Sequence, residues 1–189
     1  MTQNGAYNLR QNGVSICHGD SEHIRIRKKE DKPGIDILID GDTKGERVFI
    51  PVIVVSVSGM TDLVYNDFYI ADGADVTIVA GCGIHNSGCN ESRHDGIHTF
   101  HVGKNANVRY EEKHYGEGSG TGSRILNPVT NIEVGENSVF TLTPFRSKAW
   151  IPRCADTECF RGGRLQALCD GAHHDRRNTA CGVQIWRSA

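Results

Sequence analysis

Three stretches of the chain align with one another without a gap and at one constant spacing: FYIADGADVTI at 68–78, FHVGKNANVRY at 100–110 and IEVGENSVFTL at 132–142. Apolar residues recur at the same four positions of each stretch, and glycine, asparagine or another small residue stands between the second and the third. Apolar residues two apart share one face of a strand, and glycine or asparagine permits the positive φ of a tight turn. Each stretch therefore predicts a strand, a turn and a second strand.

One such unit cannot bury its apolar face alone, but stacked units can. Two architectures fit this pattern: a parallel β-helix with coils of about 32 residues, and a set of β-hairpins in a sandwich or barrel. The composition agrees with either, because 31 Ile and Val stand against 7 Leu, and glycine numbers 22. Branched residues favour strands, and glycine favours turns. We expect an all-β fold.

The size and charge of the chain exclude several classes of protein. Its 189 residues, 38% hydrophobic and 23% charged, are enough for one packed domain. A net charge of −2 gives no basic footprint for nucleic acid. The longest apolar run, residues 50–57, is too short to span a membrane. Polar residues follow Met1, so we expect no signal peptide and a cytoplasmic protein. Seven cysteines in such a chain indicate metal binding or free thiols rather than a disulfide framework.

Potential metal ligands crowd the first of two glycine-rich segments, 81–96 and 113–124, which we expect to form long loops on one edge of the fold. Cys82, His85, Cys89 and His94 lie within this segment, and His98 and His101 follow it directly. Thiolate and imidazole together suit zinc, iron or an iron–sulfur cluster, although the spacing matches no standard zinc finger. The alternative interpretation makes the two cysteines small residues in a tight loop.

Strand parity separates His98 from His101. His98 shares a face with Phe100, so it is equally well read as a hydrogen-bonded histidine near the edge of the core, with His101 on the surface. Because two histidines three apart point in opposite directions, a cupin-type metal site is disfavoured. Glu111 and Glu112 also point to opposite sides, and we interpret them as ordinary polar strand residues.

Several longer strings resemble the SufB/SufD family, in its short, single-gene form. They are GAYNLR at 5–10, DLVYNDFYI at 62–70, GCGIHN at 81–86, HDGIHTF at 94–100, EKHYGEG at 112–118 and RILNPVT at 124–130. The resemblance covers about residues 5–143. It implies a right-handed parallel β-helix with one coil per repeat, and a place in the Suf system, which assembles iron–sulfur clusters. Family members act as scaffolds, pair with one another and bind the ABC-class ATPase SufC.

From this resemblance we expect a non-enzymatic scaffold that handles iron or an iron–sulfur cluster transiently. The expected partners are a SufC-like ATPase and a second scaffold chain, either as a homodimer or in a SufB/SufD-type pair. Cys82, His85, Cys89, His94 and His98 are the candidate metal ligands. Two other functions stay open: a metal-dependent enzyme that uses residues 82–101, and a binding module that uses an exposed edge of the β-helix.

The repeat and the resemblance both end near residue 143. Residues 1–143 carry a net charge of −6, whereas the Cys- and Arg-rich tail 144–189 carries +4 and matches nothing in the family. We expect this tail to be irregular, and three interpretations of it compete. It is a metal module that partly resembles a CDGSH-type motif, a poorly structured appendage, or the product of a reading-frame shift near codon 144. The candidate ligands of the metal module are Cys154, Cys159, Cys169, His173, His174 and Cys181. A coil end left open after Leu142 predicts self-association unless the tail caps it.

Overall fold

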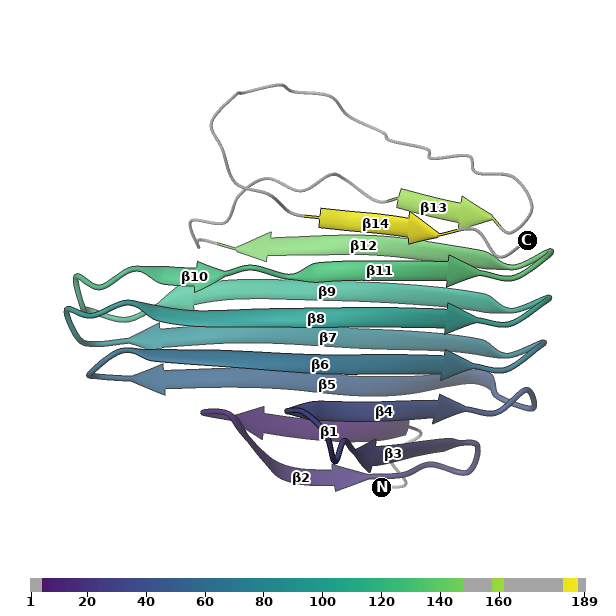
Figure 1. Ribbon diagram of the computed structural model, residues 1–189, viewed down its shortest axis with the longest axis horizontal. Coiled ribbons are helices and arrows are strands. Elements are labelled where there is room, and N and C mark those ends of the chain that lie inside the picture. Colours follow the sequence, from purple (N-terminus) through teal and green to yellow (C-terminus); the bar gives the residue numbers. More distant parts are fainter. Residues whose placement is uncertain (1–4, 148–157, 162–181, 187–189) are drawn as a thin grey trace.

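The computed structural model describes residues 5–147, 158–161 and 182–186. Two sheets face each other, and from β4 to β9 successive strands alternate between them (Figure 1). The first sheet contains, in spatial order, β13 (Glu158–Arg161), β12 (Val139–Ser147), β9 (Asn107–Glu117), β7 (Asp75–Asn86), β5 (Lys44–Ser56), β1 (Gly5–Gln11) and β2 (Val14–Gly19). The second contains β14 (Gly182–Trp186), β11 (Val129–Val134), β8 (Ser92–Val102), β6 (Met60–Ile70), β4 (Gly34–Ile39) and β3 (Ile24–Lys28), with β10 (Arg124–Leu126) also paired to β8.

Strands one repeat apart pair in parallel, which confirms the β-helix and excludes the hairpin alternative. In the second sheet Phe68 is paired with Phe100, which is paired with Ile132. In the first sheet Val76 is paired with Val108, one repeat later. Each coil of about 32 residues therefore contributes one strand to each sheet. Among the described residues every element is a strand, a turn or a connecting segment.

Tight turns at one end of the coils adopt the conformation that the repeat predicts. Gly73, Asn105 and Asn137 occupy the same position of successive repeats and have φ of 78°, 54° and 57°. The amide of Gly73 donates to the carbonyl of Lys104 at 2.8 Å, which holds neighbouring turns in register. Glycine and asparagine are the residues that enter this left-handed region most easily.

The main core lies between the two sheets near these turns. Phe68 and Phe100 stack with ring centroids 4.3 Å apart, and Phe140 meets Phe100 edge-on at 4.9 Å. All three side chains are fully buried, as is Tyr110. Burial of such side chains stabilises a fold by about 1.5–3 kcal/mol each, so stacked aromatic rings fix the coils over one another.

The expectation of long loops at 81–96 and 113–124 is wrong. Gly81–Asn86 completes β7, β8 begins at Ser92 and β9 runs to Glu117. The connections that remain are short and do stack on one edge, as expected. The amide of Gly120 donates to the carbonyl of Asn86 at 3.1 Å, and that of Gly122 donates to Gly88 at 3.0 Å.

The two ends of the β-helix differ. At the N-terminal end β2 and β3 pair antiparallel with β1 and β4, whereas at the other end β12 continues past residue 143 to Ser147. Two tail segments then form strands: β13 pairs with β12, and β14 pairs with β11. These strands extend both sheets over the coil that we expected to be open. Cys154, Cys169, His173, His174 and Cys181 lie outside the described residues, so the metal-module and reading-frame interpretations stay predictions.

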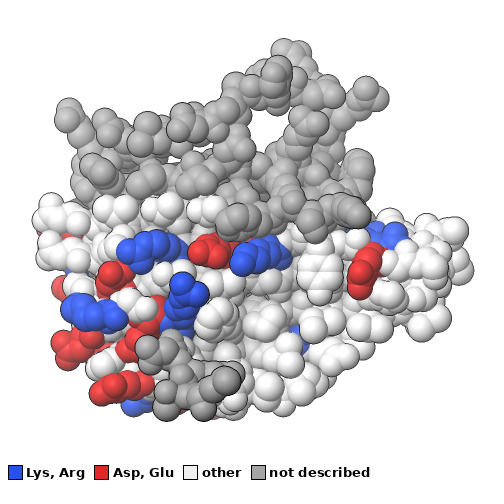
Figure 2. Space-filling model, turned by 180° about the vertical axis from the view of Figure 1, so that it is seen from behind, with Lys and Arg blue, Asp and Glu red and all other residues white. Residues whose placement is uncertain are grey.

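Two surface properties bear on partners. Within residues 5–147, 158–161 and 182–186 no helix has the length and apolar character needed to cross a membrane. Figure 2 shows Lys and Arg lying beside Asp and Glu on one face of the molecule. Ion pairs such as Lys104–Glu136 and Arg109–Asp75, at 3.0 and 3.1 Å, have the same mixed character.

Candidate functional site

The interior of the β-helix becomes polar on the side away from the tight turns. Eight buried residues form what we call the internal polar cluster: Arg10, Asp62, Cys82, His94, His98, Tyr110, Glu112 and His114. They lie beside a smaller apolar group that includes Val54, Ile84 and Leu126. A polar band inside a β-helix is costly unless its members satisfy one another, so the contacts between them decide whether it is stable.

Strand alternation and the register of the repeat place these side chains together. Inward-facing positions on β7 run from Ile78 through Ala80 to Cys82, and buried and partly exposed residues alternate along β8. Cys82 is paired with His114 on β9, one repeat later, and Asp62 on β6 is paired with His94 on β8. The cluster therefore draws on both sheets and several coils.

Arg10, Asp62 and His94 form a buried chain of charge and hydrogen bonds. Nη2 and Nε of Arg10 donate to the two carboxylate oxygens of Asp62 at 2.7 and 3.1 Å. Nδ1 of His94 lies 3.1 Å from Oδ2 of the same carboxylate. Burial alone would raise the pKa of Asp62, but hydrogen bonds from His94 and Arg10 and the charge of Arg10 lower it to about 2. Because an ionised carboxylate only accepts, Nδ1 of His94 carries the proton.

A second chain joins His98, Tyr110 and Glu112. The Tyr110 hydroxyl donates to Oε1 of Glu112 at 3.1 Å, so its oxygen accepts from Nδ1 of His98, also 3.1 Å away. Nε2 of His114 lies 3.6 Å from the same carboxylate oxygen. Burial lowers the pKa of His98 to about 3, helped by His94 and His114, so this ring is neutral near pH 7. Burial and Glu112 raise the pKa of Tyr110 well above its usual value.

Both imidazoles direct Nε2 toward the backbone of Gly96. A Cβ at this position would lie 2.9 Å from Nε2 of His98 and 3.2 Å from Nε2 of His94. A cavity of about 20 Å³ adjoins them and is also lined by Cys82, Glu112 and His114. A water molecule needs roughly 10–15 Å³ of such space, so the cavity has room for a group of about that size. Because the neutral His98 ring donates through Nδ1, its Nε2 atom presents a lone pair.

Cys82 is a protonated thiol in this environment. Its side chain is buried, and burial together with the carboxylates of Asp62 and Glu112 raises its pKa well above the usual value. The thiolate, not the thiol, ligates metals. Among the described residues no group of three or more His, Cys, Asp and Glu side chains is placed to hold a metal ion. The cluster therefore supplies sulfur and nitrogen donors without forming a complete metal site.

The structure brings together three of the five expected ligands and separates two. Cys82, His94 and His98 meet in the interior, whereas Cys89 is exposed in the connection after β7. His85 faces outward, with Nδ1 3.4 Å from Glu117 and Nε2 3.0 Å from Ser87.

The interpretation of His98 as a hydrogen-bonded, inward-facing histidine is confirmed. It is buried at 6% exposure and bonded to Tyr110. His101 faces the opposite way, stacked on Tyr69 at 4.9 Å and bonded to Glu133 at 2.7 Å. The two rings therefore cannot share one ligand, as their spacing predicted.

Sequence reasoning missed Arg10, Asp62 and His114, and it set Glu112 aside as an ordinary polar residue. Part of the signal was present: Asp62 stands one repeat before His94, and Cys82 stands one repeat before His114. The repeat spacing, applied to polar as well as apolar positions, finds both pairs. Arg10 has no such signal, because its ion pair with Asp62 joins different sheets.

The strings that resemble SufB/SufD proteins lie around this cluster. Residues 81–86 end β7, residues 94–100 lie in β8, and residues 112–118 end β9 and begin the following connection. Comparison with protein-family models, curated proteins and solved structures finds no match to this chain. The resemblance therefore rests on these strings, and the function that follows from it is a proposal.

Proposed function

We propose that this chain is a scaffold component of the Suf machinery for iron–sulfur cluster assembly, without catalytic turnover of its own. One observation carries the proposal. Strings of residues that resemble the SufB/SufD family, separate in sequence, come together around a single cavity with Cys82, His94 and His98 on its wall. The proposal includes a cytoplasmic location, a SufC-type ABC ATPase as partner and pairing with a second scaffold chain.

The chemistry of the cavity suits iron or sulfide as a transient cargo. Sulfur and imidazole nitrogen are ligands that iron accepts. Asp62 orients His94, and the Tyr110–Glu112 pair orients His98, in the way that neighbouring carboxylates orient metal-binding histidines. Because Cys82 is protonated and the ligand set is incomplete among the described residues, a resident metal does not fit these side chains. A cargo bound here needs a further ligand or a shift of these side chains.

Anaerobic reconstitution tests the proposal. The full chain is incubated with ferrous iron and sulfide, desalted, and examined for the visible absorption of sulfide-to-iron charge transfer. We expect the signal in the wild type and its loss in Cys82→Ser/Cys89→Ser. Cys17→Ser is the matched control, since Cys17 is an exposed thiol on β2. A signal that survives in the double variant assigns the cluster to the tail cysteines and contradicts the proposal.

The proposed partners need a separate measurement. Size-exclusion chromatography with light scattering of this chain, alone and mixed with a purified SufC-type ATPase, reports both pairing and ATPase binding. We expect a complex that contains the two proteins together. A chain that neither pairs nor binds the ATPase, and also fails to assemble a cluster, would exclude the scaffold function.

A further inference from the structure

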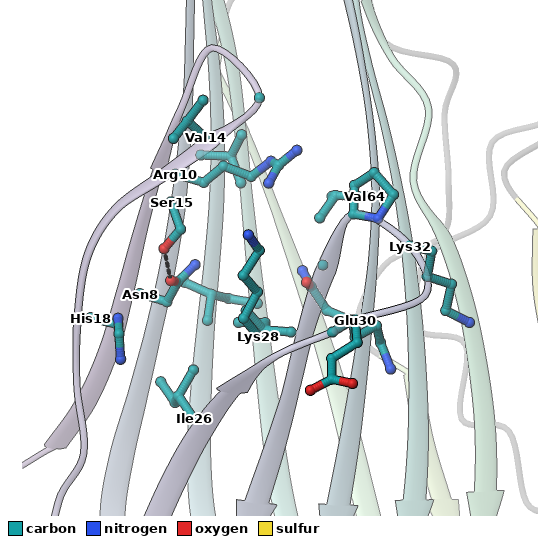
Figure 3. A pocket seen from close by; sticks show the side chains of 18 of the residues that line it. Asn8, Arg10, Val14, Ser15, His18, Ile26, Lys28, Glu30, Lys32 and Val64 are labelled. Atoms are coloured by element: carbon teal, nitrogen blue, oxygen red, sulfur yellow. Dashed lines mark hydrogen bonds between the residues drawn. The ribbon is translucent and has the colours of Figure 1, made fainter.

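A groove of about 930 Å³ opens at the N-terminal end of the β-helix, between the β1–β2 hairpin and β3 with its turn to β4 (Figure 3). It forms because β2 and β3 end their sheets and pair only with β1 and β4, so the space between the sheets opens to the surface there. Its volume falls in the range of small-molecule sites, about 300–1,000 Å³. The groove therefore has room for a small organic ligand.

Two cationic side chains that line the groove have hydrogen-bond donors that no described residue engages. Arg10 binds Asp62 through Nε and Nη2, and no described residue bonds its Nη1. Lys28 stands exposed at the end of β3 and lines the groove, and no described residue forms an ion pair with it. Figure 3 shows Arg10 and Lys28 reaching into the space between the hairpin and the sheet.

Two neighbouring charges, Lys29 and Glu30, are already engaged or turned away from Lys28. Nζ of Lys29 is held by Asp36 and, at 2.7 Å, by Asp67. Glu30 also lines the groove, but its carboxylate extends away from the ammonium group of Lys28 (Figure 3).

Asp31 and Lys32 line the groove as well, and Nζ of Lys32 lies 4.9 Å from the centre of the Tyr65 ring. Lys28 and the free edge of Arg10 are therefore cationic groups of the groove that no described residue pairs. Such a pair favours an anionic group.

Asn66 supplies an independent sign of a missing partner. Its side chain lines the groove although the residue is only 4% exposed, and its Oδ1 is buried without a hydrogen bond from any described residue. A buried acceptor left unpaired destabilises the folded protein. Buried polar groups in folded proteins are almost always satisfied. Because Oδ1 is itself buried, a ligand in the groove reaches it only after the Asn66 amide turns, and a hydrogen bond donated to it there removes this cost.

The rest of the floor is apolar. Ile26, Ile50, Val52 and Val64 line the groove from β3, β5 and β6, and Val14 stands at 58% exposure on the hairpin. Apolar walls with a few placed polar groups are typical of sites for small organic molecules. A bare inorganic anion would leave these walls without a partner.

We propose that this groove binds an amphipathic organic anion. Its carboxylate lies against Lys28 and Nη1 of Arg10, a hydrogen-bond donor meets Oδ1 of Asn66, and its apolar body packs on the isoleucine and valine floor. The groove holds neither Cys82 nor His98, although it shares Arg10 with the internal polar cluster and Ile50 and Val52 with the cavity there. Binding of an organic anion in the groove does not depend on the proposed scaffold function.

Calorimetric titration of the full chain with three matched probes tests this assignment. The probes are 2-hydroxyoctanoate, which carries every feature, octanoate, which lacks the hydroxyl donor, and 2-octanol, which lacks the carboxylate. We expect 2-hydroxyoctanoate to bind most tightly and each omission to weaken binding by roughly tenfold, as for the loss of one hydrogen bond that involves a charge or a buried acceptor. A groove that is merely apolar would bind 2-octanol best, and that result, like no binding at all, would overturn the proposal.

Three variants assign the contacts. Lys28→Gln should weaken both acids roughly tenfold and leave 2-octanol unchanged, whereas Lys104→Gln, an exposed lysine on a distant turn, should change nothing. Asn66→Leu should abolish the preference for the hydroxylated acid while keeping octanoate binding. Equal effects of the two lysine variants would overturn the assignment, and this comparison stands even if Asn66→Leu fails to fold. Competition by inorganic phosphate at equal affinity would also overturn it.

Discussion

Nδ1 of His94 lies 3.1 Å from Oδ2 of Asp62, the residue paired with it one coil earlier in the same sheet. The other side of that carboxylate faces Arg10, which belongs to β1 in the opposite sheet. Asp62 therefore links two coils within one sheet and joins the two sheets across the interior. This carboxylate thus adds a polar link between coils and sheets beside the smaller apolar group of Val54, Ile84 and Leu126.

Replacing Asp62 with Asn should destabilise the protein strongly. The side chains of Arg10 and Asp62 are 9% and 2% exposed, so the variant leaves a buried guanidinium without its anion. Breaking a buried ion pair in this way costs about 3–5 kcal/mol. Urea unfolding followed by circular dichroism measures the loss. Glu136→Gln, which removes the partner of the exposed Lys104, is the control and should leave the midpoint unchanged. Equal midpoints for the two variants would contradict the linking role of Asp62.

Acid should destabilise the protein in two steps. The pKa of His98 is lowered from its ordinary value of 6.5 to about 3 in the folded protein. Between these two pH values the unfolded chain therefore binds a proton at His98 that the folded chain does not bind. Stability is therefore full above 6.5 and falls as the pH drops toward 3, by about 1.4 kcal/mol per pH unit for one proton. Asp62, with a pKa lowered from 3.8 to about 2, adds a second loss as the pH falls through that lower window.

Urea unfolding over the upper window checks the first step. His98→Gln removes the titrating ring, so its free energy of unfolding should fall less steeply between about pH 6 and 4, by close to one proton. His18→Gln, at an exposed position on β2, should keep the wild-type slope. If His98→Gln and the wild type show the same slope, His98 is not the group that resists protonation.

The fold could be predicted from the sequence because every coil buries apolar side chains at the same positions of the repeat. Apolar positions such as Phe68 and Phe100 recur once per repeat since each must stack on the next. Glycine content predicts turns, and this prediction is wrong where a glycine instead leaves room for a neighbouring side chain. Gly83 was read as part of a loop, but it lies in β7, where a Cβ would collide with the ring of Tyr115. Glycine content alone does not distinguish these two uses.

The site was only half predictable. Parity placed His98 inward and His101 outward, because alternation is a local property of a strand. The contact between Arg10 and Asp62 spans 52 residues and crosses from one sheet to the other, so no local pattern reports it. Cys89 and His85 seemed to belong with Cys82 because they are close in sequence. Cys89 follows the strand, and His85 lies on its outer face.

Gly96→Ala should disturb both imidazoles of the cluster. The new methyl group would lie 2.9 and 3.2 Å from the Nε2 atoms of His98 and His94, both held by hydrogen bonds on their other side. Overpacking of this kind costs about 1–3 kcal/mol. Gly81→Ala is the matched control, since its methyl group meets only the carbonyl of Lys113, at 3.9 Å. Imidazole nitrogen NMR and urea unfolding should show changes in the first variant alone. Unchanged imidazole signals in Gly96→Ala would contradict the proposed convergence.

Substitutions at Asn105 should change the stability of the protein according to how well each residue tolerates a positive φ. Its φ of 54° lies in the left-handed region, where a β-branched residue is strained. Asn105→Val should therefore lower the free energy of unfolding by about 1–2 kcal/mol, whereas Asn105→Gly should be close to neutral. The two variants differ only in the side chain at one turn, so the comparison of their urea midpoints isolates the conformational cost. A valine variant as stable as the glycine variant would mean that the turn relaxes.

Alkylation should distinguish the three cysteines of residues 5–147. Cys17 and Cys89 are exposed, whereas Cys82 is buried and its pKa is raised by burial and by Asp62 and Glu112. Since the thiolate is the nucleophile, iodoacetamide should modify Cys17 and Cys89 first and Cys82 many times more slowly. Mass spectrometry of the digested protein measures each site, with fragment ions separating Cys82 from Cys89. In urea all three should react at similar rates. Rapid labelling of Cys82 in the native protein would show that the internal polar cluster is open to solvent.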